Sequence, residues 1–475
     1  MVAASSLLAL PLLATAVAAY NASQHQLNPV QLIGANSPWF SGPSQGIPYV
    51  VPEGCTVDTA AFVSRHASRY PDLAAWQQWT NLSAKIDAAT FTVSESAPEL
   101  KFLETWKPVV RTPSQDISAI NVGGYKELQV QYDMGVTYRY RYPDFYTDNS
   151  PFIAWANQYP AAPRVIDSAR LFTRGYMGPN ATRSGEVYVL NSTDPRGYAN
   201  SLGTGDGCST IHGGSGVEST TWDNTYLPPI TARINSLLKG NLTFTNTDIT
   251  NMPYLCGMET PILGYQSPWC AVFTDDELEG YEYAQDIKYY YGGGPGSYKN
   301  GTVMLPVLNS VIQRFQDGPN KTYTSSDGSK FQPPPLSAMF TNDGQINQLV
   351  SQIGVFDDQA PLPTTYIPAG NKYVASHFVP MRGTIGFERL TCSAKHYMRI
   401  TLNDVVYAVP SCKSGPGQSC PLDTYAALIA NKTAAAGTFP QICNISSTGA
   451  TQAELTMKST FLQDDALPWG YFVSP

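Results

Sequence analysis

Residues 65–71 read RHASRYP and directly follow the apolar run AAFVS at residues 60–64. The apolar run predicts a short buried strand that ends at the charged pair Arg65-His66. A helical pattern follows over residues 72–89. A functional group at the carboxyl end of a buried strand, just before a helix, occupies the usual site position of open α/β sheets. The sequence therefore predicts an α/β fold with a functional site around His66.

The motif places two guanidinium groups on either side of one imidazole. Arginine side chains bind phosphate oxygens in a bidentate manner and keep their charge at any working pH. Positive charge from Arg65 and Arg69 should lower the pKa of His66 and favour neutral imidazole, which is the nucleophilic form. On spacing alone, a basic cluster on the surface is the commoner explanation, because the motif is short.

The composition limits the classes of partner. The chain has 475 residues, of which 43% are hydrophobic and only 14% are charged, and its formal net charge is -8. Charged residues make up roughly 25% of an average globular chain, so attached sugars could help to keep this surface soluble. An acidic chain repels a phosphate-rich polymer, which argues against nucleic acid as a partner. A small anionic substrate would need a local basic pocket.

The first nineteen residues have the pattern of a signal peptide. Residues 7–19 are apolar and end in small side chains, although no basic residue precedes them. The run is too short to span a bilayer, and no later stretch reaches about 18 uninterrupted apolar residues. We therefore expect a secreted protein, extracellular or in the cell wall, without a membrane anchor.

Cysteines and glycosylation sequons agree with export. The eight cysteines form an even set without C-x-x-C spacing, so disulfides are favoured over zinc. Nine N-x-S/T sequons together predict a glycoprotein. The sequons lie at Asn21, Asn81, Asn180, Asn191, Asn241, Asn300, Asn320, Asn431 and Asn444.

Other motifs favour structural explanations. Thr274 and Glu277 fit a capping box, which predicts a helix to about residue 291 and explains the acidic cluster there better than a glycosidase carboxylate pair does. The glycine-rich residues 292–296 lack the lysine of a P-loop and indicate a helix end. His212 precedes a glycine-rich loop, but no G-x-S-x-G accompanies it. Strands are expected at residues 337–341, 384–391 and 396–409.

Taken as a whole, the chain resembles a known family. RHASRYP resembles the RHGxRxP signature of the histidine acid phosphatases, and the fungal branch of acid phosphatases and phytases matches several further segments. The resemblance runs in one order from about residue 28 to the C-terminus. The further segments are SPWFSGPSQGIPYVVPEGC, PRVIDSARLFTRG, CAVFTDDELEGYEYAQDIKYYYGGGPG, FTNDGQINQLVSQIGVFDD, SHFVPMRGTIGFERLTC and LNDVVYAVPSC.

The resemblance implies a fold of two parts. An α/β domain with a mixed sheet flanked by helices would carry a smaller, mostly helical inserted domain, with the site in the cleft between them. The α/β part would comprise residues 20–75, 155–215 and 330–475, and the helical part residues 76–154 and 216–329. The cysteine pairs implied are Cys55–Cys392, Cys208–Cys443, Cys256–Cys270 and Cys412–Cys420; the number of cysteines alone leaves 105 pairings open.

The resemblance also implies roles for individual residues. His66 matches the nucleophile that accepts the phosphoryl group, and Asp343 matches the acid that protonates the leaving group. Arg65, Arg69 and Arg164 match the phosphate-binding arginines. The implied activity is hydrolysis of small phosphate monoesters with no metal or organic cofactor, and a phytase that acts on inositol hexakisphosphate is a narrower alternative. A homo-oligomer is compatible with the sequence.

Two positions depart from the family. Asn342 stands where the family has a histidine that donates a hydrogen bond to phosphate; asparagine also donates, but without positive charge. Losing a charged donor could cost on the order of 1.5–3 kcal/mol, so a catalytically impaired member that binds phosphate esters is a second hypothesis. Ala67 replaces a glycine, and one extra methyl group there should be tolerated. None of the other histidines, at His25, His212, His377 and His396, lies in the matching motif.

Overall fold

The computed structural model describes residues 26–111, 125–158, 163–208, 210–211, 215–445 and 459–475. The signal-peptide pattern and Asn21 lie outside these ranges, as do His25 and His212. Within them, nine strands form one mixed sheet in the order β11-β10-β9-β1-β8-β3-β4-β13, with β12 beside β10. The strands are β1 (Cys55–Arg65), β3 (Phe152–Asn157), β4 (Gly185–Leu190), β8 (Leu336–Thr341), β9 (Thr384–Cys392), β10 (Lys395–Leu402), β11 (Val405–Tyr407), β12 (Cys420–Pro421) and β13 (Gly470–Val473).

The centre of the sheet is parallel and its edges are antiparallel. β1, β8, β3 and β4 run in one direction, whereas β9 and β13 pair antiparallel on either side. Successive residues of β1 point to opposite faces. Ala61 and Val63 join one hydrophobic cluster, and Ala60 and Phe62 join the other. Burial on both faces explains why this strand is apolar throughout its second half.

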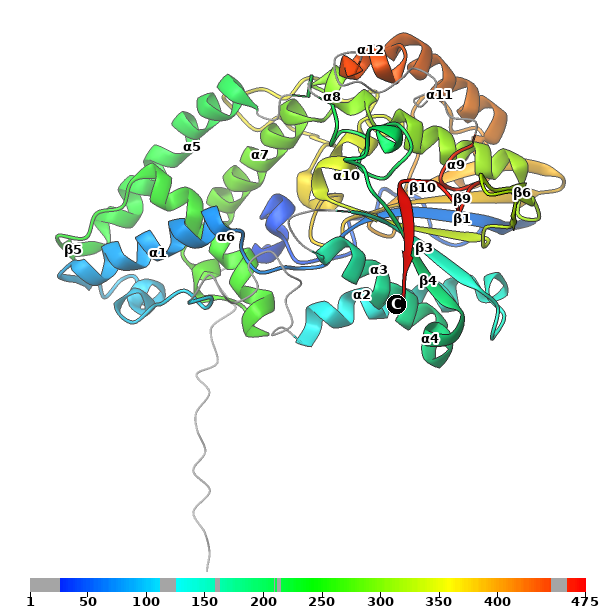
Figure 1. The fold of residues 1–475 in the computed structure, drawn as a ribbon. Coiled ribbons are helices and arrows are strands. Elements are labelled where there is room, and N and C mark those ends of the chain that lie inside the picture. Colours follow the sequence, from blue (N-terminus) through cyan, green and yellow to red (C-terminus); the bar gives the residue numbers. More distant parts are fainter. Residues whose placement is uncertain (1–25, 112–124, 159–162, 209, 212–214, 446–458) are drawn as a thin grey trace, which may run out of the picture.

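Helices cover both faces of the sheet (Figure 1). On one face, α2 and α3 pack together, and Phe62 contacts Tyr138 of α2 and Phe172 of α3 at ring-centroid distances of 4.8 and 5.0 Å. The other face carries α8 to α12. These helices are α2 (Tyr125–Arg141), α3 (Arg164–Met177), α4 (Ala181–Ser184), α8 (Tyr298–Thr302), α9 (Leu305–Asp317), α10 (Asp343–Val350), α11 (Leu422–Ala436) and α12 (Phe439–Cys443).

A second group of helices stands beside the sheet, to the left in Figure 1. It consists of α1 (Leu73–Ala88), α5 (Gly216–Ser236), α6 (Asn246–Leu263) and α7 (Asp275–Gly292), with the small pair β2 (Phe91–Val93) and β5 (Leu238–Gly240). The short pair β6 (Tyr323–Thr324) and β7 (Lys330–Phe331) lies apart from it, near the sheet. The main expectation of a mixed sheet flanked by helices, with a helical part beside it, is confirmed.

Helix starts follow their capping residues. The Asp72 side chain accepts a hydrogen bond from the backbone nitrogen of Ala75 at 2.9 Å and begins α1. Thr274 and Glu277 form the expected capping box of α7. The helix ends at Gly292, where the glycine-rich segment begins.

The strand expected at residues 396–409 was too long. The structure divides it into β10 and β11, joined at Asn403 and Asp404, whose φ angles are 44° and 65°. Asparagine and aspartate are the non-glycine residues that most readily adopt this left-handed backbone, and two of them in a row make a tight hairpin turn.

Three helices inside the ranges expected for the helical part lie against the sheet: α8, which lies on the face that also carries α10 to α12, and two others. The two others are α2, through the contact of Tyr138 with Phe62, and α9, in which Asn309 donates a hydrogen bond of 3.1 Å to Thr433 of α11. We propose that the helical part is narrower and comprises α1, α5, α6 and α7 with the segments between them.

Among the described residues, four disulfides join the cysteines in the pairs that the family resemblance implies: Cys55–Cys392, Cys208–Cys443, Cys256–Cys270 and Cys412–Cys420. The first pair links the start of β1 to the end of β9. No helix in these parts of the chain is long and apolar enough to cross a membrane.

Candidate active site

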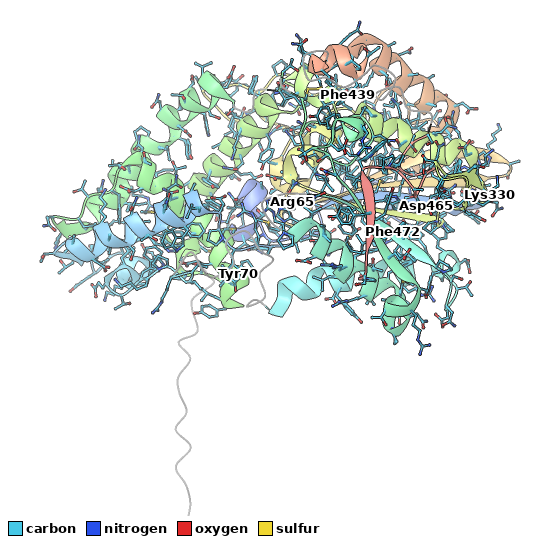
Figure 2. The ribbon with its side chains drawn as sticks, viewed as in Figure 1. Arg65, Tyr70, Lys330, Phe439, Asp465 and Phe472 are labelled. Atoms are coloured by element: carbon cyan, nitrogen blue, oxygen red, sulfur yellow. A yellow bond between two sulfur atoms is a disulfide. The ribbon has the colours of Figure 1, made fainter. Side chains whose placement is uncertain are left out.

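The sheet brings two separate segments of the sequence together. β1 and β8 are parallel neighbours, and Arg65 at the end of one lies opposite Thr341 at the end of the other. The backbone nitrogen of His66 donates a hydrogen bond of 3.1 Å to the carbonyl of Thr341. His66 therefore leaves the sheet beside Asn342 and Asp343, at the carboxyl edge where open α/β sheets hold their sites. In Figure 2, Arg65 marks this edge next to the helical group.

The imidazole of His66 is almost completely buried, with 1% of the residue exposed. Its Nδ1 lies 2.7 Å from the carbonyl oxygen of Ala67. A carbonyl only accepts hydrogen bonds, so Nδ1 carries the proton and Nε2 keeps a free lone pair. Burial, together with the charges of Arg65, Arg164 and Arg69, holds the pKa of His66 well below its usual 6.5. The ring is therefore neutral in mild acid, which is the protonation state that a nucleophilic imidazole requires.

Helix α3 fixes the loop that carries His66. The backbone nitrogen of Ala67 donates a hydrogen bond of 3.0 Å to Oγ of Ser168, which in turn donates one of 2.7 Å to the carbonyl of Arg164. Ala67 is fully buried and does not have a positive φ. Its backbone therefore does not require glycine, and the departure from the family motif causes no strain there.

Arg65 is held by backbone carbonyls. Its Nη1 donates to the carbonyl oxygens of Ala35 and Val379, at 2.5 and 2.7 Å. Its Nη2 lies 3.8 Å from Oδ2 of Asp343. The side chain is 3% exposed, so its position is set before any substrate arrives. A charge fixed in this way costs little reorganisation when it binds an anion.

The other two arginines approach from different elements. Arg69 follows β1, in the loop that carries His66. Its Nη1 donates a hydrogen bond of 2.9 Å to the carbonyl oxygen of Tyr70, and its Nη2 lies 3.4 Å from Oδ2 of Asp72. Arg164 is the first residue of α3 and is 8% exposed. The positive charge of all three arginines acts on His66. The expected phosphate-binding set is thus gathered around one imidazole.

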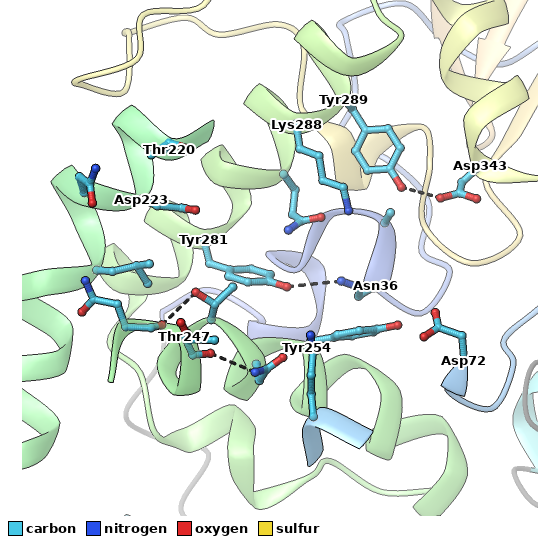
Figure 3. Close-up of a pocket in the computed structure, with 18 of the residues that line it drawn as sticks. Asn36, Asp72, Thr220, Asp223, Thr247, Tyr254, Tyr281, Lys288, Tyr289 and Asp343 are labelled. Carbon is cyan, nitrogen blue, oxygen red and sulfur yellow. Dashed lines mark hydrogen bonds between the residues drawn. The ribbon is translucent and has the colours of Figure 1, made fainter. Parts of the chain in front are cut away.

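Asp343 faces a partner that the sequence did not single out. The hydroxyl of Tyr289, on α7, donates a hydrogen bond of 2.6 Å to Oδ2 of Asp343 (Figure 3). Burial favours the protonated carboxyl, but Arg65, the Tyr289 hydroxyl and the neighbouring positive groups outweigh it and hold the pKa of Asp343 well below its usual 3.8. Asp343 is therefore ionised in the free protein.

Asn342 is a buried residue between β8 and α10. It is 8% exposed and precedes α10, yet its side chain does not cap that helix. Its Oδ1 is buried and has no hydrogen-bond partner among the described residues. A buried amide without a partner is costly in a stable fold. The amide of Asn342 thus keeps a hydrogen-bonding oxygen that no described protein group uses.

A cavity of about 640 Å³ opens from this site towards the helical group. Arg65, Arg69 and Asp343 line part of it, and residues of α1, α5, α6 and α7, with Ala35, Asn36 and Asp72, line the rest (Figure 3). Cavities of ~300–1,000 Å³ are typical of small-molecule sites. Among the described residues, no group of three or more His, Cys, Asp or Glu could hold a metal ion.

The two remaining histidines in the described ranges lie elsewhere. His377 packs edge-on against Phe40, and burial lowers its pKa from 6.5 to about 4. His396 lies on β10, with Nδ1 3.0 Å from the hydroxyl of Thr391. Neither lines the cavity.

Residues 56–403 match the model of the histidine phosphatase superfamily, branch 2. The chain belongs to this family. It is accordingly a phosphomonoester hydrolase. The match includes the elements that carry His66 and Asp343.

Among curated proteins, the chain is similar to fungal relatives. It is 28% identical to a phytase of Candida albicans over 85% of this chain and 84% of the relative. It is 29% identical to a thiamine-repressible acid phosphatase of Schizosaccharomyces pombe, covering 82% and 84% of the two chains. A repressible acid phosphatase of Saccharomyces cerevisiae is 26% identical, over 89% and 88%. Among solved structures, the phytase from D. castellii shares the fold with a TM-score of 0.75 at 22% identity, over 92% and 93%.

Proposed function

We propose that this histidine phosphatase is a secreted acid phosphatase that hydrolyses phosphate monoesters through a phosphohistidine at His66. The observation that carries the proposal is the buried, neutral imidazole whose Nδ1 donates to Ala67. Its Nε2 is the free nucleophile, and three guanidinium groups surround it. Export is supported by the four disulfides of the described residues and by the sequons on exposed positions such as Asn81, Asn241 and Asn431.

In the first step, Nε2 of His66 attacks phosphorus, and the bond from phosphorus to the ester oxygen breaks. Arg65, Arg69 and Arg164 hold the equatorial oxygens, where negative charge is spread in the transition state. Asp343 gives its proton to the departing alkoxide, which leaves as the alcohol. The products of this step are the alcohol and a phosphoryl group bound to His66.

The proton on Asp343 must be acquired with the substrate. Arg65 keeps Asp343 ionised in the free protein. A bound phosphate brings negative charge to the same arginines, which offsets their effect and raises the pKa of Asp343. In acid the substrate is largely a monoanion, since the second pKa of a phosphate ester is about 6. That monoanion can hand its own proton to Asp343.

In the second step, water attacks the phosphoryl group. The carboxylate of Asp343, left after the first step, takes the proton of this water, and the bond between phosphorus and Nε2 breaks. Inorganic phosphate leaves and His66 returns to its neutral form. Both steps use the same two side chains in opposite directions.

The second candidate is an impaired member that binds phosphate esters without efficient turnover. Asn342 motivates it, because the amide contributes no positive charge to the bound phosphate. Because one relative is named a phytase, we keep inositol hexakisphosphate as an alternative substrate of this chain.

Release of phosphate from p-nitrophenyl phosphate at about pH 3–6 separates these candidates. The glycosylated protein, recovered from the culture medium of a fungal host, should turn over the substrate. His66→Ala should abolish turnover while leaving the melting temperature within a few degrees. A correctly folded protein without turnover would favour the binding protein. Retention of the protein inside the cells would contradict secretion.

A further inference from the structure

The cavity wall beyond the phosphate end is polar but almost without charge. Six residues of this wall have side chains with no hydrogen bond or ion pair to the described residues. Four of them are neutral amides or hydroxyls, one is a lysine and one is an aspartate. They are Gln78, Asp223, Asn224, Thr247, Gln285 and Lys288.

Asp223 is the decisive member of this wall. It lies on α5, and Figure 3 shows it beside Thr220, across the pocket from Asp343. No cation pairs with it among the described residues, and burial raises the pKa of its carboxyl. Among the described residues, the cationic side chains that line the cavity are Arg65, Arg69 and Lys288, which lies on α7. Its Nζ lies 5.7 Å from the ring centre of Tyr289.

The charges of this wall do not suit a polyphosphate. Inositol hexakisphosphate with one phosphate at His66 would bring five more into the cavity. Beyond Arg65 and Arg69, the described lining offers these phosphates one lysine. An ionised Asp223 would repel them, and a protonated Asp223 would supply no positive charge. A neutral alcohol with several hydroxyl groups fits better, because each hydroxyl can exchange its water for an amide, a threonine hydroxyl or a carboxylate.

Resting on the function proposed above, we propose that the helical wall binds a neutral, polyhydroxylated leaving group, so that the preferred substrates are monophosphate esters of sugars or polyols. Asp223 accepts hydrogen bonds from hydroxyls of this group, and Lys288 donates to them. Asp223, which has no ion-pair partner among the described residues, disfavours polyphosphates. The end of the cavity lined by Arg65 and Arg69 binds the phosphate of any monoester.

The test compares kcat/KM of the full-length protein for four substrates. p-Nitrophenyl phosphate measures the proposed phosphatase activity itself. The preference of the cavity wall is measured with a hexose 6-phosphate, butyl phosphate and inositol hexakisphosphate. We expect the hexose phosphate to exceed both butyl phosphate and inositol hexakisphosphate by about tenfold or more. Equal kcat/KM values for the hexose and butyl phosphates, or a higher kcat/KM for the hexakisphosphate, would overturn this inference. Turnover of p-nitrophenyl phosphate in the same experiment would still support the proposed function.

Variants assign this preference to Asp223. Asp223→Lys should shift the ratio of hexose phosphate to hexakisphosphate turnover by about tenfold towards the hexakisphosphate, and the near-isosteric Asp223→Asn should shift it less in the same direction. Glu218→Lys is the matched control: it makes the same charge change on α5, outside the cavity lining. A ratio that moves equally in Glu218→Lys, or in neither variant, would contradict the role of Asp223. Absence of p-nitrophenyl phosphate turnover would contradict the proposed function and this inference with it.

Discussion

The hydroxyl of Tyr289 donates a hydrogen bond of 2.6 Å to Oδ2 of Asp343. Tyr289 lies on α7 in the helical group, whereas Asp343 follows β8 of the sheet. The proposed proton donor is therefore held from both parts of the molecule, by Tyr289 from one and by Arg65 from the other. The two parts must keep their relative position for the carboxyl to stay aimed at the substrate.

Tyr289→Phe should slow substrates that need a proton on their leaving group. We expect a fall of about three- to tenfold in kcat for an alkyl phosphate, from loss of one hydrogen bond. The fall should be smaller for p-nitrophenyl phosphate, whose leaving group departs without much protonation. Steady-state kinetics with both substrates tests this. Equal losses would show that Tyr289 supports the fold rather than Asp343.

Asn342→His should restore a charged donor to the phosphate. The expected gain in kcat/KM is about ten- to a hundredfold in acid, where the new imidazole is protonated. Asn342→Ala should lose activity, because it removes the donor altogether. If Asn342→His were no faster than the natural protein, a charged donor at this position would add nothing to the transition-state stabilisation that the amide supplies.

Stability should fall as the pH rises from mild acid to neutrality. Burial raises the pKa of Glu259 from 4.5 to about 7, although the Trp106 indole and the Ser267 hydroxyl donate to it. The folded state then keeps a proton that the unfolded state loses, so the contribution is full below about pH 4.5 and is lost as the pH rises through 7. The loss is at most about 3 kcal/mol.

Melting temperatures of Glu259→Gln over this pH range check the effect. The variant should show a flatter pH dependence than the natural protein. Glu95→Gln, at an exposed position, serves as the control and should keep the natural slope. If the melting temperature of Glu259→Gln depended on pH as steeply as that of the natural protein, the raised pKa of Glu259 would be contradicted.

The sequon at Asn300 should stay unmodified in the folded protein. Its Nδ2 donates a hydrogen bond of 3.0 Å to the carbonyl of Gly292, and the residue is only 7% exposed. A glycan on this nitrogen would be incompatible with that packing. Glycopeptide mass spectrometry should find Asn81 occupied, since it is exposed on α1, and Asn300 empty. Occupancy at Asn300 in active protein would contradict the packing of this segment.

The sequence could predict the parts of the site that depend on local order. The apolar run before His66 forms β1, and the capping box at Thr274 begins α7, because strand burial and capping are set by neighbouring residues. The turn at Asn403 and Asp404 was not predicted. Both residues favour a positive φ, but the apolar residues on either side made residues 396–409 look like one continuous strand.

The contacts between the two parts could not be predicted in the same way. The bond from Tyr289 to Asp343 joins residues 54 positions apart. The position of Asp223 in the cavity depends on how α5 packs beside α7. A tyrosine on α7 resembles the other tyrosines of that helix in sequence, and only the folded structure distinguishes the one that reaches the site.

The most direct test of the mechanism is to locate the phosphoryl group during turnover. Protein mixed with labelled p-nitrophenyl phosphate for milliseconds is quenched in alkaline denaturant, because phosphohistidine survives in base, and its peptides are mapped. The account predicts label on Nε2 of His66, and none in His66→Ala. Label on another residue, or unaltered hydrolysis by His66→Ala, would contradict it.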